Sequence, residues 1–172
     1  RTELFTSVVE ARNAKQLAPE VLAAANRQID ATIKGLGDHY QGIWLSDAEG
    51  IIFAGCLKNG DTTAYTNLDI RDRGYLKKAR QTRQPVIGDP MRSKIGNVPI
   101  VVVCTPLADA KGQPIGYFGM SLEIDYLIQT VARQKVGANG YAFVVDGTGL
   151  MVAHPDPERV LKVIVRARGT LP

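Results

Sequence analysis

The sequence predicts an α+β fold built around an antiparallel sheet. Apolar residues in the first 40 positions recur every three or four residues, which is the period of a helix. Pairs of β-prone segments follow, each pair joined by a polar turn. Helical segments separate these pairs without the regular strand–helix alternation of a parallel sheet. The chain has 172 residues, 45% of them hydrophobic and 22% charged, which is enough apolar material for a substantial core.

Residues 1–40 are expected to form a long N-terminal helix. Pro19 suits the first turn of a helix, so a new or bent helix can begin there. Gly35 and Gly37 mark the end of the helical segment. A helix of this length before a small domain is typical of one that continues from a membrane span, so we expect a fragment of a longer protein. The apolar stripe consists of Leu22, Ala25, Ile29, Ile33, Leu36 and Tyr40.

Residues 41–136 are expected to form the sheet module and a linker helix. Residues 42–46 and 51–54 read as strands joined by the turn Asp47-Ala48-Glu49-Gly50. Residues 98–106 and 116–122 read as a second, longer hairpin. Helices are expected at 71–82, with Asp69 as its N-cap, and at 123–136.

Residues 137–172 are expected to form a partial or minimal second module, because they contain a second copy of the first hairpin. Asp47 aligns with Asp146 and Gly50 with Gly149, and each copy reads as strand, Asp-x-x-Gly turn, strand. The alternative is that two hairpins merely share the same turn chemistry.

Four segments in this order resemble the double Cache sensor domains of bacterial chemotaxis receptors, sensor kinases and diguanylate cyclases. They are "DAEGIIFAG", "NLDIRDRGYLKKARQTRQPVIGDP", "VPIVVVCTPLADAKGQPIGYFGMSLEIDYL" and "GANGYAFVVDGTGLMVAHPDP". The resemblance implies a membrane-distal PAS-like module with a five-stranded antiparallel sheet backed by the long helix, followed by a membrane-proximal module of similar fold. It also implies a ligand-sensing domain on the periplasmic side of the cell membrane. The parent would be a homodimer anchored by membrane helices, with a cytoplasmic signalling domain.

The same resemblance places a ligand between the sheet and the loops above it. In amino-acid-binding members an Arg holds the ligand carboxylate and a Trp follows two residues later. Here Arg73 and Tyr75 hold those positions, whereas Leu68 and Leu76 replace the family's two Tyr residues. These departures leave an organic acid, an amino acid, an amine or another small metabolite open. Independently of the family, a guanidinium can hold a carboxylate through two hydrogen bonds, although Arg73 could instead pair with a neighbouring Asp on the helix surface.

Four further residues are candidate ligand contacts. Asp89 could bind a ligand ammonium group or could cap a turn, since Pro90 follows it. Trp44 lies on the first strand, where it could line the pocket or belong to the core. Tyr65, on a loop, and Tyr117, on a strand, are weaker candidates of the same kind.

Other classes of function lack sequence support. No nucleophile elbow, metalloprotease motif or phosphate-binding loop is present, so we expect no enzyme activity and no cofactor. The net charge of +4 comes with no nucleic-acid motif. His154 and Asp156 are too few ligands for a metal site, and the prolines beside Asp156 favour a turn.

Cys56 and Cys104 could form one disulfide or remain two buried thiols. A cytoplasmic PAS-type interaction or dimerisation module remains the alternative function.

Overall fold

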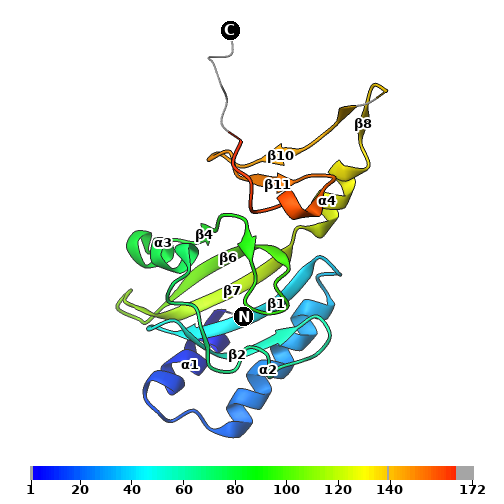
Figure 1. Ribbon diagram of the computed structural model, residues 1–172. Helices are drawn as coiled ribbons and strands as arrows, with labels where there is room; N and C mark the ends of the chain where they lie inside the picture. The colour runs from blue at the N-terminus through cyan, green and yellow to red at the C-terminus, as the bar shows by residue number, and fades with distance from the viewer. Residues whose placement is uncertain (1, 139, 166–172) are drawn as a thin grey trace. The chain divides into compact units, whose positions relative to one another are not determined.

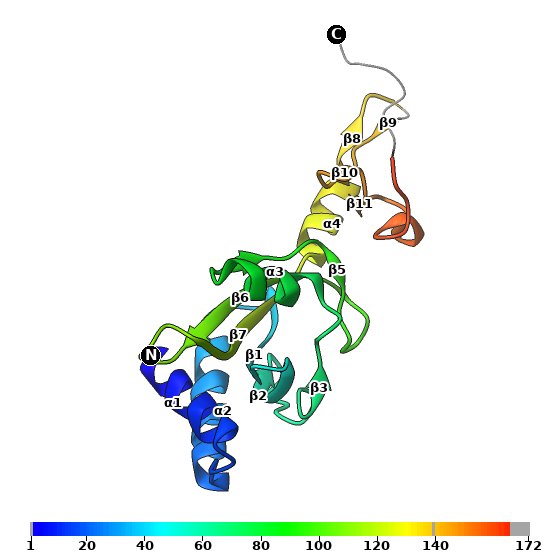
Figure 2. The same cartoon turned by 90° about the vertical axis from the view of Figure 1, so that its left-hand side faces the viewer.

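The computed structural model describes residues 2–138 and 140–165. The chain divides into two compact units (Figures 1 and 2). One comprises Arg1–Asp89 and Val101–Leu122, and the other comprises Pro90–Ile100 and Glu123–Pro172. The first unit contains all six candidate ligand residues.

The N-terminal segment forms two helices, not the single long helix expected for residues 1–40. They are α1 (Thr2–Asn13) and α2 (Pro19–Lys34). Lys15 adopts a left-handed backbone conformation, which ends α1, and Pro19 begins α2 because a proline needs no N–H donor in a helix's first turn. The predicted apolar stripe is confirmed at Ala25, Ile29 and Ile33, which are the buried residues of α2. Within the described residues, no helix has the length and apolar character needed to cross a bilayer.

The main sheet is antiparallel, as expected, but it contains seven strands where five were expected. The strand order is β3-β2-β1-β7-β6-β4, and β5 also pairs with β6. Three of the seven strands are only two residues long. The strands are β1 (Tyr40–Asp47), β2 (Ile51–Leu57), β3 (Leu68–Asp69), β4 (Val86–Ile87), β5 (Met91–Arg92), β6 (Pro99–Ala108) and β7 (Pro114–Glu123).

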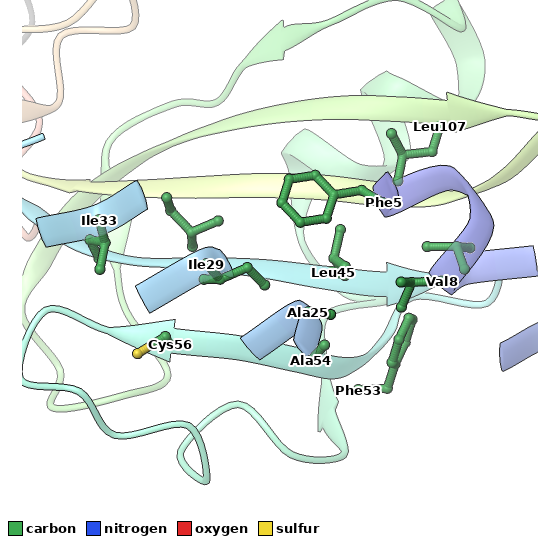
Figure 3. Packing of buried hydrophobic residues seen from close by; sticks show 12 residues of the cluster. Phe5, Val8, Ala25, Ile29, Ile33, Leu45, Phe53, Ala54, Cys56 and Leu107 are labelled. Atoms are coloured by element: carbon green, nitrogen blue, oxygen red, sulfur yellow. The ribbon is translucent and has the colours of Figure 1, made fainter. Parts of the chain in front are cut away.

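The hydrophobic core of the first unit lies between α1, α2 and one face of the sheet (Figure 3). Ile29 and Ile33 of α2 and Val8 of α1 are almost completely buried against Leu45 and Cys56 of the strands. The Asn26 side chain also accepts a hydrogen bond from the Gly55 N–H over 3.0 Å, which joins α2 to β2. Helices α1 and α2 cover this face of the sheet, and the opposite face is left to other elements.

Helix α3 (Gly74–Thr82) follows β3, and its N-terminus differs from the expectation. Asp69 does not cap the helix. Its carboxylate accepts hydrogen bonds from the backbone N–H and guanidinium of Arg71. The backbone of Arg73 is extended and occupies the N-cap position. Arg80 donates to the carbonyl oxygens of Ala48 and Glu49, which fastens α3 to the β1–β2 turn.

The second unit contains α4 and two short hairpins. The turn between β10 and β11 matches the β1–β2 turn: Gly149 and Gly50 both have a positive φ, and the carboxylates of Asp146 and Asp47 both accept backbone N–H groups of their turns. The Asp156 N–H donates to His154 Nδ1 at the following turn, as the prolines indicated. The elements are α4 (Asp125–Ala132), β8 (Lys135–Val136), β9 (Gly140–Tyr141), β10 (Val144–Val145), β11 (Met151–Ala153) and the 3₁₀ turn η1 (Pro157–Arg159).

Candidate functional site

The candidate site is the face of the main sheet opposite α1 and α2. Side chains alternate between the faces of a strand, so Ile43 and Leu45 enter the helix-covered core while Trp44 and Ser46 point to the opposite face. In β7, the residues paired with Trp44 and Ser46 are Gly119 and Tyr117. Trp44 and Ser46 therefore share one face of the sheet.

Trp44 lies at the centre of this face and is only 1% exposed. Its indole ring lies directly over Gly119, where a Cβ atom would come within 2.0 Å of the ring. The indole Nε1–H donates to the Ser121 hydroxyl over 3.4 Å. The ring of Tyr75 lies beside the indole, with 6.1 Å between the ring centroids. Trp44 thus connects the sheet to α3.

Tyr65 reaches the same face from the loop between β2 and β3. The Asp61 carboxylate accepts hydrogen bonds from the backbone N–H groups of Thr63 and Ala64, which holds the loop in a compact turn. The Tyr65 ring lies against Gly42 and Gly55, where a larger residue would collide with it. Glycines on two adjacent strands therefore create the space that this ring fills.

The Tyr65 hydroxyl is buried and has no hydrogen-bond partner among the described residues. Burial raises the pKa of this phenol well above its usual range, and the nearby Ser121 hydroxyl, outside hydrogen-bonding geometry, offsets this only in part. A buried hydroxyl without a partner costs about 1–3 kcal/mol. Such groups are rare in native proteins, and an acceptor on a bound molecule is one explanation.

Tyr75 and Arg73 come from the start of α3. Tyr75 is 5% exposed, whereas Arg73 is half-buried. Burial raises the pKa of the Tyr75 phenol, and the positive charge of Arg73 offsets part of this rise. Arg73 is the N-cap of α3 and Tyr75 lies in its first turn, so the backbone holds these two residues close together.

The remaining two candidates, Tyr117 and Asp89, differ from each other in burial. Tyr117 is 3% exposed and its ring lies 6.0 Å from the guanidinium carbon of Arg80. Asp89 follows β4 and is exposed. The structure thus gathers four of the six candidates as buried aromatic side chains on one face, with Arg73 half-buried and Asp89 in contact with solvent.

Sequence analysis overlooked Ser121 and the glycines that accommodate the rings. Gly119 and Ser121 alternate with the larger Phe118 and Met120 along β7. The small residues share one face of the strand and leave room there for side chains from other elements. This alternation could therefore have indicated the site from the sequence.

Two large hollows lie elsewhere in the first unit, and none of the six candidate residues lines either one. A hollow of about 530 Å³ lies on the helix-covered side and is lined by Leu4, Phe5, Gln28, Thr32, Thr105, Leu107 and Phe118. A hollow of about 780 Å³ lies beside the α1–α2 connection and is lined by Arg12, Asn13, Lys15, Leu17, Asp47, Ala48 and Glu49.

Both cysteines are free and buried, so of the two alternatives left open by the sequence the structure has two buried thiols and no disulfide. Burial raises the pKa of Cys56 to about 11 and that of Cys104 to about 12. Both thiols therefore stay protonated near neutral pH and are poor nucleophiles.

Comparison with known proteins identifies relatives among bacterial sensors. The chain is 28% identical over 113 residues to sporulation kinase D of Bacillus subtilis, covering 66% of this chain and 21% of the kinase. It is 26% identical over 130 residues to the methyl-accepting chemotaxis protein PscA of Pseudomonas syringae, covering 76% of this chain and 20% of the receptor. The chain thus spans about a fifth of the length of each of these two relatives.

A solved structure has the same fold. The ligand-binding domain of the Pseudomonas fluorescens chemoreceptor CtaA, solved in complex with L-isoleucine, superimposes with a TM-score of 0.59 at 25% sequence identity. The match covers 94% of this chain and 62% of the CtaA domain. The family model described as the Cache domain matches residues 2–170. Because this match extends over nearly the whole sequence, the chain belongs to the Cache domain family.

Proposed function

We propose that this chain is the ligand-sensing part of a bacterial transmembrane receptor and that it binds a small metabolite on the sheet face opposite α1 and α2. The observation that carries the proposal is the buried hydroxyl of Tyr65, which has no hydrogen-bond partner among the described residues and lies on the sheet face that also carries the Trp44 and Tyr75 rings. A ligand acceptor at this hydroxyl would offset the cost of burying it. The relatives named above favour a receptor over a cytoplasmic interaction module.

In this proposal, the side chains have distinct roles. Arg73 binds a ligand carboxylate through two hydrogen bonds. Trp44, Tyr65, Tyr75 and Tyr117 surround the rest of the ligand. Asp89, in contact with solvent at the end of β4, is the candidate partner for a cationic group at the edge of the site.

The location and assembly of the parent protein also belong to the proposal. We infer that the domain lies on the periplasmic side of the cell membrane in a membrane-anchored homodimer. A reporter enzyme that is active only outside the cytoplasm, fused after this domain in the parent gene, should be active in cells. Activity of a cytoplasmic reporter at the same position would contradict the inferred location.

Binding can be tested with the purified chain and a panel of amino acids, organic acids and amines. A ligand at a hundred-fold excess over its Kd stabilises the fold by about 2.7 kcal/mol, which a thermal shift detects. Arg73→Ala should abolish the shift produced by an anionic ligand while leaving the melting temperature of the free protein close to that of the wild type. Lys77→Ala, which removes an exposed cation from the same helix, is the matched control. If Arg73→Ala binds as tightly as the wild type, Arg73 is not part of the site.

A further inference from the structure

The polar atoms on the candidate face are an indole N–H, which can only donate a hydrogen bond, and hydroxyl groups, which can donate or accept one. The indole nitrogen of Trp44 can only donate, and it already donates to the hydroxyl oxygen of Ser121. The Tyr65 hydroxyl, next to Ser121, has a hydrogen to donate and no acceptor among the described residues. A ligand oxygen that accepts a hydrogen bond from the Tyr65 hydroxyl would complement this end of the site.

The buried part of the site also offers no partner for a positive charge. Within residues 2–138 and 140–165, the buried polar side chains are an amide, three hydroxyls and an imidazole, and none is a carboxylate. The carboxylates near α3 lie outside the buried part of the site: Asp69 forms an ion pair with Arg71, and Asp72 and Asp89 are exposed. Burying an ammonium group without a paired carboxylate is costly, and an exposed pair with Asp89 would contribute about 0–1 kcal/mol.

We propose, on the basis of the function proposed above, that the site selects carboxylic acids that carry an uncharged oxo or hydroxyl oxygen in place of the α-ammonium group of an amino acid. The carboxylate lies at Arg73, and the second oxygen accepts a hydrogen bond from the Tyr65 hydroxyl. This specificity differs from that of the amino-acid-bound chemoreceptor domain with the same fold.

Matched ligands that differ only at the second carbon provide the test. Pyruvate, lactate and alanine form one such set, and 4-methyl-2-oxopentanoate, 2-hydroxy-4-methylpentanoate and leucine form a larger one. Isothermal titration of the full chain should show that the oxo or hydroxy acid of at least one set binds at least about ten-fold more tightly than the matched amino acid, a difference of about 1.4 kcal/mol.

The Tyr65→Phe variant tests the second contact. It removes one oxygen, so it should weaken binding of the oxo or hydroxy acid about ten-fold. The melting temperature of the free protein should stay the same or rise, because the variant removes a buried group that lacks a partner. Tyr126→Phe, at an exposed tyrosine in the other unit, is the matched control and should bind as the wild type does.

The possible results separate this specificity from ligand sensing itself. If an amino acid binds more tightly than its oxo and hydroxy counterparts, the specificity is overturned and the receptor function stands. If Tyr65→Phe binds the oxo or hydroxy acid unchanged, the assigned contact is overturned. If no acid, amino acid or amine binds at millimolar concentration, both proposals fail.

Discussion

Replacing Gly119 with alanine should disrupt the packing of the candidate site. The new Cβ would lie 2.0 Å from Cζ2 of Trp44 and 2.1 Å from Cε2, whereas contacts below 3.0 Å are essentially never observed. The indole would have to move by about 1 Å or more. It is 1% exposed and has no solvent space to enter.

Overpacking of this kind costs about 1–3 kcal/mol, and we expect the upper end because backbone and ring are both confined. For a chain of this size, each kcal/mol lowers the melting temperature by about 2–4 °C. Gly119→Ala should therefore melt about 6–12 °C below the wild type when followed by circular dichroism. It should also lose any ligand response, because the indole is displaced.

Two controls make this experiment decisive. Gly74→Ala adds a methyl group in open space at the first position of α3, so it should be neutral or slightly stabilising. Combining Gly119→Ala with Trp44→Leu should cost less than the sum of the two single changes, because the smaller side chain leaves room for the methyl group. A melting temperature of Gly119→Ala within 1–2 °C of Gly74→Ala would refute the packing described here.

Two further outcomes follow from the burial of apolar and titratable groups. Ile29→Ala, at a side chain with no exposed surface, should destabilise the chain by about 2–5 kcal/mol in urea unfolding. Val21→Ala, at an exposed side chain on the same helix, should cost far less. Equal losses of unfolding free energy in the two variants would contradict the core assignment. Because burial raises the pKa of Cys56 from 9.0 to about 11 and that of Cys104 to about 12, the folded state binds these protons more tightly than the unfolded state. This stabilisation is complete below pH 9 and is lost as the pH rises toward 11–12, so the melting temperature should fall across that range. A melting temperature that stays constant up to about pH 11 would argue against buried thiols.

The repeating patterns of the sequence specified the local structure. The helical period in residues 25–33, the alternation along residues 42–46 and the Asp-x-x-Gly turns all predicted elements that the structure contains. These features depend on neighbours a few positions apart, and short-range hydrogen bonds satisfy them. The Arg73 and Tyr75 pair was likewise evident from a local motif.

Two local features were not settled by periodicity. The apolar period continued the helix through the break before α2, although Pro19 indicated where a new helix could begin. Asp69 was a plausible cap from its position, yet its carboxylate binds Arg71, two residues further along the chain.

Only the register of β1 against β7 places Trp44 over Gly119 and beside Ser121. These residues are far apart in the chain, and no local pattern encodes which of them meet. The sequence alone therefore determined the fold class and the turns. The tertiary structure determined which buried hydroxyl lacks a partner, because hydrogen-bond satisfaction depends on all the atoms that surround a group in space.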